Sequence, residues 1–277
     1  MVMVKKKLSL PNVGGAPKGQ TGMGKMTISD DFGKVLKHLA DSFKGQKYEP
    51  EKWDCEDMSY YGAATARCAF PGIPVGIALR GDKRAEPGHA QIILWDLGPE
   101  PTYIYCDPAN GGKIGKPEDF DPDVIVPFPI MKKWGVQVPS PLEKLPALDG
   151  PGVSLDNEYD FDLVNAGTIQ NELNAKKLEG ECKPPENTVA RDRYYDLDAR
   201  FFSQPDRTFY RFAQLKKKYK GAPIGFAFGT APSKKDGSKI ETARIMLWKT
   251  SGDYTYWKVG DGERQKEPNF APKIVLV

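Results

Sequence analysis

A cysteine, a histidine and an aspartate are placed where they could act together on an acyl group. Cys55 lies at the start of a helix-like segment that runs from about Asp54 to Ala69, His89 begins an apolar run, and Asp107 directly follows another. A thiol has a pKa of about 8.5 and needs help to ionise. A helix N-terminus favours the thiolate, an imidazole takes its proton, and a carboxylate fixes the imidazole tautomer. Together, the three residue types predict a nucleophilic thiol site.

The immediate neighbours of the cysteine work against a thiolate. Asp54, Glu56 and Asp57 surround Cys55, and negative charge disfavours ionisation of a thiol. We expect Asp54 to cap the helix while the other two carboxylates point elsewhere. Trp53 is a candidate oxyanion donor or site neighbour through its indole N–H, although packing is the favoured interpretation.

The elements that would position these residues follow from hydrophobic spacing. Phe32, Val35, Leu39 and other apolar residues recur on one face of a helix that begins near Ser29. Strand-like runs span residues 75–79, 90–95, 102–106 and 124–128. Antiparallel pairing of the second and third runs would put His89 and Asp107 at the same end of the ribbon. A helix packed on that sheet would bring Cys55 to them.

The second half of the chain repeats the first. "GIPVGIAL" returns as "GAPIGFAF", "AQIILW" as "ARIMLW", "DMSYYGAA" as "DRTFYRFA", and "FDPDVIV" as "FAPKIVL", at an offset of 149 to 153 residues. Thr102-Tyr103 is matched to Thr255-Tyr256. Such a repeat predicts two tandem copies of one α+β unit, each a helix packed on an antiparallel sheet. In the second copy Gln204, Thr242 and Gly260 replace Cys55, His89 and Asp107, so it is expected to be catalytically inactive.

Four segments follow from these patterns. Residues 1–27 are expected to form an extended basic, Gly-rich arm, residues 28–130 the unit with the thiol site, residues 131–160 a linker, and residues 161–277 the degenerate repeat.

The motifs around the three residues resemble a known family. "DCEDMSYYGAATARCAFPGIP", "GHAQIILWD" and "TYIYCDP" resemble the transglutaminase-like superfamily of papain-like cysteine enzymes, particularly its bacterial cysteine-proteinase branch. The match covers Trp53 to Pro108. It implies a papain-like fold, with Cys55 as nucleophile, His89 as base and Asp107 as orienting acid. It also implies an acyl-enzyme thioester on a protein or peptide substrate, released by water or an amine.

Composition limits other functions. The net charge of +3 is small, which leaves no signature of nucleic-acid or membrane binding. The four cysteines have no metal-ligand or redox spacing, so neither metal nor cofactor is expected and the thiols are expected to be reduced. No signal peptide or membrane span is expected, which favours the cytoplasm or a large assembly.

A non-enzymatic class competes with the enzyme hypothesis. The repeat reuses the scaffold without the thiol, histidine and aspartate. The chain could therefore be a structural component of a virus particle or other large complex, with assembly partners that hold residues 1–27 in place. The sequence leaves both classes open.

Overall fold

The computed structural model describes the helices, the strands and some of the turns that join them. The described residues are 30–50, 52–70, 73, 75–80, 88–96, 102–115, 120, 122, 124–128, 169, 172–173, 204–233, 235–249, 254–259, 264–265 and 269–276. The expected arm and linker lie outside them. Helices and antiparallel sheets together give an α+β fold.

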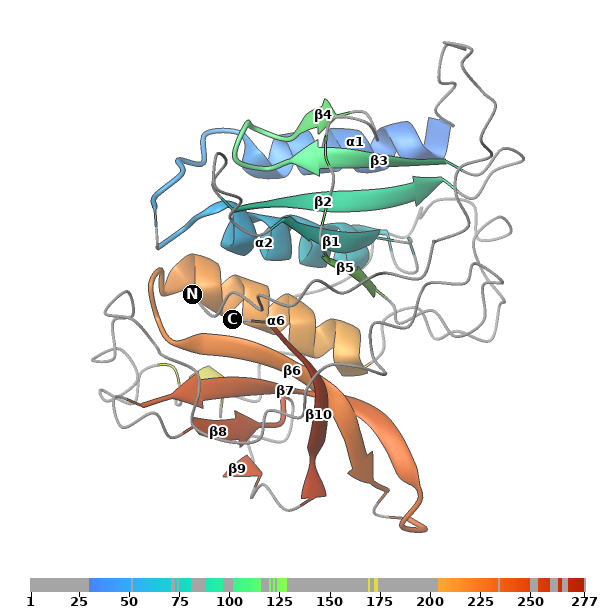
Figure 1. The fold of residues 1–277 in the computed structure, drawn as a ribbon, viewed down its shortest axis with the longest axis vertical. Helices are drawn as coiled ribbons and strands as arrows, with labels where there is room; N and C mark the ends of the chain where they lie inside the picture. Colours follow the sequence, from blue (N-terminus) through green and yellow to red (C-terminus); the bar gives the residue numbers. More distant parts are fainter. Residues whose placement is uncertain are drawn as a thin grey trace.

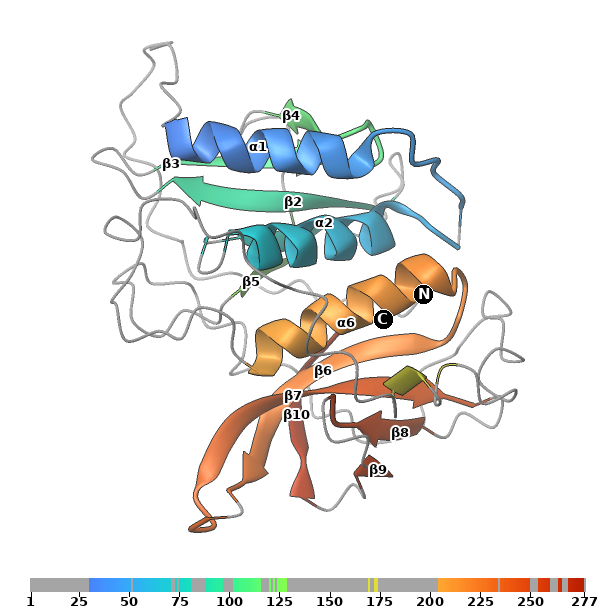
Figure 2. The ribbon, with the colours of Figure 1, turned by 180° about the vertical axis from the view of Figure 1, so that it is seen from behind.

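The first half of the molecule consists of two helices and a five-stranded sheet. Its elements are α1 (Asp30–Phe43), α2 (Cys55–Ala69), β1 (Val75–Arg80), β2 (His89–Asp96), β3 (Thr102–Asp107), β4 (Lys113–Gly115) and β5 (Val124–Phe128), and the strand order is β4-β3-β2-β1-β5. Both helices lie against one face of this sheet (Figures 1 and 2). The apolar stripe of α1 is buried, as its spacing predicts. The short strand β4 was not expected.

The second half has one helix and another five-stranded sheet. Its elements are α6 (Gln204–Lys218), β6 (Ile224–Pro232), β7 (Lys239–Trp248), β8 (Tyr254–Trp257), β9 (Arg264–Gln265) and β10 (Ala271–Leu276), in the strand order β10-β6-β7-β8-β9. Read from β9 to β10, this order matches that from β4 to β5. Figure 1 shows α2 and α6 side by side between the two sheets.

Strand register also agrees between the halves. Gly76 pairs with Ile93 in the first sheet, and Gly225 pairs with Met246 in the second. These four residues occupy the positions that the repeated sequences assign to one another. His89 pairs with Arg80, and Thr242 pairs with Gly229, so Thr242 holds the place of His89.

One alignment from the sequence is wrong. Trp95 pairs with Tyr103, whereas Trp248 pairs with Tyr254, so Tyr254 rather than Tyr256 corresponds to Tyr103. Seven residues separate Trp95 from Tyr103 but only five separate Trp248 from Tyr254, and the turn between two strands tolerates such a change better than the strands do. Lys258, rather than Gly260, therefore follows β8 at the position that Asp107 holds in β3. Gly260 itself lies outside the described residues.

The contact between α2 and α6 is reciprocal. Arg67 of α2 pairs with Asp206 of α6 at 2.9 Å, and Lys216 of α6 pairs with Asp57 of α2 at 2.9 Å. Asp57 corresponds to Asp206, and Arg67 to Lys216, in the two helices. Tyr60 meets its counterpart Phe209 between the two pairs. This is the arrangement of a twofold interface, here formed within one chain.

Candidate active site

Cys55 is the first residue of α2. Asp54 is the N-cap, and its Oδ1 accepts hydrogen bonds from the backbone N–H groups of Glu56 at 2.9 Å and Asp57 at 3.1 Å. The expected capping role of Asp54 is thus confirmed. Asp57 turns away from the thiol to its partner on α6. The helix N-terminus therefore presents the Cys55 side chain to the end of the first sheet.

The thiol is held neutral at rest. Cys55 is only 7% exposed. Burial raises the pKa of its thiol to about 12, and the negative charges of Asp54 and Glu56 add to the effect. Hydrogen bonds from the N–H groups of Ala90 and of Cys55 itself act in the opposite direction but are outweighed. Burial, followed by the charges of Asp54 and Asp57, also raises the pKa of Glu56 to about 7.

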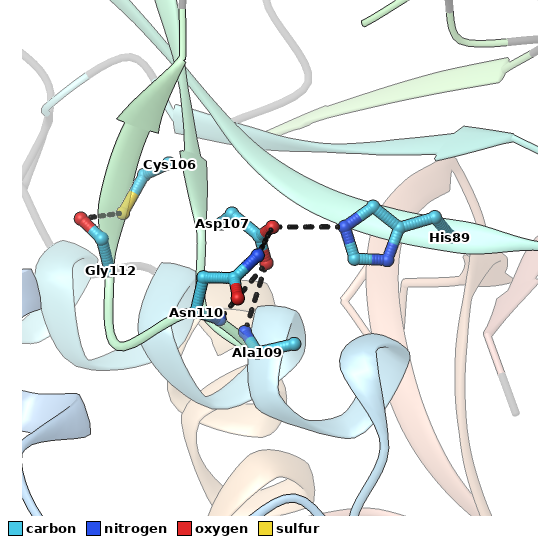
Figure 3. A network of polar contacts seen from close by, with 6 residues as sticks. All are labelled: His89, Cys106, Asp107, Ala109, Asn110 and Gly112. Carbon is cyan, nitrogen blue, oxygen red and sulfur yellow. Dashed lines mark hydrogen bonds and ion pairs between the residues drawn. The ribbon is translucent and has the colours of Figure 1, made fainter.

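His89 and Asp107 meet at the ends of their strands. Figure 3 shows the ring of His89 facing the Asp107 carboxylate, and His89 Nε2 lies 3.3 Å from Asp107 Oδ2. Strands β2 and β3 are antiparallel, so the start of one lies beside the end of the other. The sequence predicted this neighbourhood from the strand pattern alone. With Nε2 engaged, Nδ1 is the ring nitrogen that remains for another partner.

The Asp107 carboxylate is fixed by the turn that follows it. Its Oδ1 accepts from the backbone N–H of Ala109 at 3.0 Å, and its Oδ2 accepts from Asn110 Nδ2 at 2.6 Å (Figure 3). Burial opposes its ionisation, but the hydrogen bonds from His89 and Asn110 prevail and lower the pKa of Asp107. A fixed, ionised carboxylate is suited to orienting an imidazole.

The three residues gather at one end of the sheet, but they are not all in contact. The pairing of β2 with β3 ends at Ile92 and Cys106, which leaves the N–H of Ala90 available to the Cys55 sulfur. Ala90 is the neighbour of His89 in β2. Among the described residues, no hydrogen bond joins the Cys55 sulfur to the His89 ring. The structure therefore pairs the histidine with the aspartate and places the thiol beside the next residue.

Trp53 packs rather than pointing an open donor into the site. Its side chain is buried, and its Nε1–H donates to Gln46 Oε1 at 3.1 Å. A short antiparallel bridge between Glu49 and Trp53 sets this arrangement. Because the indole N–H is already engaged, the geometry favours the packing interpretation over the oxyanion role.

Tyr48 was missed by the sequence analysis. It precedes the bridge to Trp53, and its side chain is largely exposed. Partial burial raises the pKa of its phenol, and its electrostatic interactions with Cys55, Asp54 and Glu56 add to the rise. The phenol thus lies within electrostatic range of the thiol. Nothing in the sequence spacing marks it, because its proximity depends on the bridge.

The outer face of each sheet is the face opposite the helices. On the first sheet it carries an apolar cluster of Ala78, Ile93, Tyr105 and Phe120. The Phe120 ring contacts His89 edge-on at 5.9 Å and lies under Arg80 at 5.3 Å. Gln91, two residues after His89, has a buried Oε1 without a hydrogen-bond partner. These neighbours of the histidine were also not predicted.

The remaining described cysteines do not point into the site. Cys106 points to the face of the sheet opposite Asp107, as strand alternation predicts, and is buried in the main core. Burial raises the pKa of its thiol to about 12. Cys68 is buried and disulfide-bonded, so the expectation that all the thiols are reduced is wrong. Cys182 lies outside the described residues.

In the second half the corresponding positions carry no thiol or imidazole. Gln204 begins α6, and its Oε1 accepts from the N–H of Ala243 at 3.0 Å and from the hydroxyl of Thr242 at 3.0 Å. Its Nε2 donates to Ala243 O at 3.0 Å and Thr208 Oγ1 at 2.9 Å. The amide therefore fills the place of the thiol with a closed set of hydrogen bonds.

Comparisons with protein-family models, curated proteins and solved structures found no match. Across the described part of the chain, no helix has the length and apolar character that a membrane crossing requires. The same residues hold no group of three or more His, Cys, Asp or Glu side chains arranged to bind a metal ion.

Proposed function

We propose that the first half is a thiol-dependent acyl-transfer site, in the class of cysteine peptidases, amidases and transglutaminase-like enzymes. The observation that carries the proposal is the His89–Asp107 pair at 3.3 Å, located where the Cys55 sulfur accepts from the neighbouring Ala90 N–H. The motif resemblance to the transglutaminase-like superfamily supports the same assignment. It also supports two tandem papain-like units, of which the second is inactive.

The raised pKa of the thiol determines the form of the mechanism. A resting thiolate is disfavoured, so the proton leaves the sulfur as the sulfur attacks the acyl carbon. His89 accepts that proton through Nδ1, while Asp107 on Nε2 stabilises the imidazolium. The Cys55 backbone N–H serves as an oxyanion donor.

Collapse of the tetrahedral intermediate completes the first stage. The bond from the acyl carbon to the leaving amine breaks, and His89 returns the proton to that amine, which leaves a Cys55 thioester. Water or a second amine then attacks the thioester, again with His89 as base, and the sulfur recovers its proton. The substrate is a protein or peptide, as the family resemblance implies.

An acyl-transfer assay with an activated ester tests this proposal without a known substrate. We expect p-nitrophenyl acetate to release a burst of nitrophenolate and to leave an acetyl group on Cys55, identified by peptide mass spectrometry. His89→Ala should slow acylation by about 10²- to 10⁴-fold, because the general base is lost. Asp107→Asn should slow it less.

The chain supplies a matched control. Cys106 is a buried thiol whose pKa is also raised to about 12, and it lies on the face of β3 opposite Asp107. Burial alone predicts equal, slow acylation of Cys55 and Cys106. Equal acetylation of Cys55 and Cys106, unchanged by His89→Ala, would refute the enzyme proposal.

A second candidate function is a structural role in a large assembly. The buried, neutral Cys55 thiol favours it, as does the second half, which keeps the strand register while Gln204 and Thr242 replace the reactive groups. Partners would then hold residues 1–27, which lie outside the described residues. Equal labelling in the preceding assay is the result that this candidate requires.

A further inference from the structure

Arg244 is a buried cation that has no carboxylate partner in the described part of the chain. It lies on the outer face of β7, is 5% exposed, and has no ion pair among the described residues. One terminal nitrogen, Nη1, donates to Thr242 Oγ1 at 2.7 Å and to Ala243 O at 2.8 Å. Buried charges are normally paired, and an uncompensated one is costly. Because no described residue supplies a counter-charge, the burial of this cation calls for a reason.

The unused donors of Arg244 form one edge of the guanidinium. Its Nε is buried without a hydrogen-bond partner, and Nη2 makes no hydrogen bond to any described residue. Nε and Nη2 lie on the same side of the planar group, which is the edge that binds a carboxylate or phosphate with two parallel hydrogen bonds. The Phe270 ring lies 5.2 Å from Cζ and supports the plane.

The equivalent position in the first half also carries an unpartnered polar atom, of opposite kind. Gln91 pairs with Ala78, and Arg244 pairs with Ala227, so the two side chains share one register position. The unpartnered atom of Gln91 is an acceptor, Oε1, whereas those of Arg244 are donors. Lys258 follows β8 where Asp107 ends β3. At these two positions, then, the second half carries cationic side chains where the first half carries acceptors. The first half has its own guanidinium at this end, Arg80 over Phe120, but that residue is on β1 rather than on the central strand.

We propose that the outer face of the second sheet binds a small oxyanion, a carboxylate or a phosphate, on the Nε–Nη2 edge of Arg244. Thr242 holds the other end of the guanidinium in place, and Phe270 stacks beneath it. Lys258 adds positive charge at the same end of the sheet. This site does not depend on the acyl-transfer proposal, because none of its residues belongs to the Cys55 site.

Thermal unfolding of the full chain tests the site. The chain is titrated with sodium acetate in one series and sodium phosphate in another, each against sodium chloride at matched ionic strength. We expect the melting temperature to rise by about 2–4 °C at anion concentrations tenfold above the dissociation constant. A rise with acetate alone assigns a planar carboxylate, and a rise with phosphate alone assigns a tetrahedral anion.

Two methionine variants locate the effect. Arg244→Met removes the charge at similar volume and with it the cost of burying an unpaired cation. We expect it to abolish the anion-dependent rise. Arg207→Met removes the same charge from an exposed position of α6 and should keep the rise. A rise of wild-type size in Arg244→Met, or none in the wild-type chain, would overturn the proposal.

A crystal of the wild-type chain soaked in phosphate or acetate gives a readout that needs no variant. We expect anion density within about 3 Å of Arg244 Nε and Nη2. Soaks at saturating concentration that leave this edge empty would refute the site even if Arg244→Met failed to fold.

Discussion

The two halves of the molecule solve the same local problem with different side chains. In both sheets the pairing of the central strand with its neighbour, β2 with β3 or β7 with β8, ends before an alanine of the central strand. The backbone N–H of that alanine is then free, and the first side chain of α2 or α6 accepts a hydrogen bond from it. In the first half the Cys55 sulfur accepts from the N–H of Ala90, and in the second half Gln204 Oε1 accepts from the N–H of Ala243. Sulfur is a weak acceptor, whereas an amide oxygen is a strong one. The scaffold alone therefore favours glutamine, and a thiol kept there needs a reason beyond packing.

The residues at the ends of the central strands also differ between the halves. In the first half His89 pairs with the Asp107 carboxylate. In the second half the Thr242 hydroxyl donates to Gln204 and accepts from Arg244. An imidazole and a carboxylate can move a proton, but a hydroxyl held between an amide and a guanidinium cannot do so at neutral pH. The comparison separates a half suited to chemistry from a half suited to binding and packing.

The largest effect should come from breaking one of the buried ion pairs that join the halves. Asp206→Ala leaves the Arg67 guanidinium buried, and among the described residues only the Ile73 carbonyl remains as its hydrogen-bond partner. We expect the free energy of unfolding to fall by about 3–5 kcal/mol, measured by urea denaturation. Asp57→Ala should act likewise through Lys216.

Two controls sharpen this test. The exposed pair of Lys37 and Asp41 has the same 2.9 Å separation, and Asp41→Ala should leave unfolding unchanged because water screens the charges. Replacing both members of a buried pair, as in Asp57→Leu with Lys216→Met, should restore most of the stability. A double variant no more stable than Asp57→Ala would show that the interface does not depend on the pairing.

A smaller effect is expected at the helix starts. Gln204→Ala removes a fully bonded amide and leaves the Ala243 N–H and the Thr242 hydroxyl without their acceptor. We expect a loss of about 1–3 kcal/mol in the free energy of unfolding. Cys55→Ala removes only a weak acceptor and should cost less. If Cys55→Ala were the more destabilising of the two, the thiol would be a structural group and the contrast between the halves would disappear.

The smallest effect concerns the charge beside the thiol. Because the pKa of Cys55 is raised to about 12, its thiolate fraction should grow roughly tenfold per pH unit between pH 7 and 10. The rate of alkylation by iodoacetamide, followed by mass spectrometry, should rise with it. Asp54→Asn keeps the helix cap but removes a negative charge, so the pKa of the thiol falls and the rate rises several-fold at each pH.

The matching control is alkylation of Cys106, whose raised pKa is attributed to burial and to Asp107 rather than Asp54. Its rate should not respond to Asp54→Asn. A rate at Cys55 that levels off below pH 8 would mean that a thiolate already exists there.

Sequence reasoning was most accurate where the physics is local. The helix from Cys55 to Ala69, its Asp54 cap and the four strands of the first half follow from apolar spacing and punctuating residues. The end-to-end placement of His89 and Asp107 followed from antiparallel pairing. The alignment of the two halves failed at β8. Matching the Thr-Tyr dipeptides shifted β8 by two residues, because strand register, not residue identity, decides which positions correspond.

The sequence by itself determined the repeated helices and strands, since hydrophobic period and capping act within a few residues. It also determined which side chains stand at the strand ends, His89 and Asp107 in one half and Thr242 in the other. Only the tertiary structure decided the burial of the Cys55 thiol, the engagement of the Trp53 indole and the isolation of Arg244 from any described carboxylate. Desolvation and hydrogen-bond partners depend on residues far apart in the chain, and no local pattern encodes them.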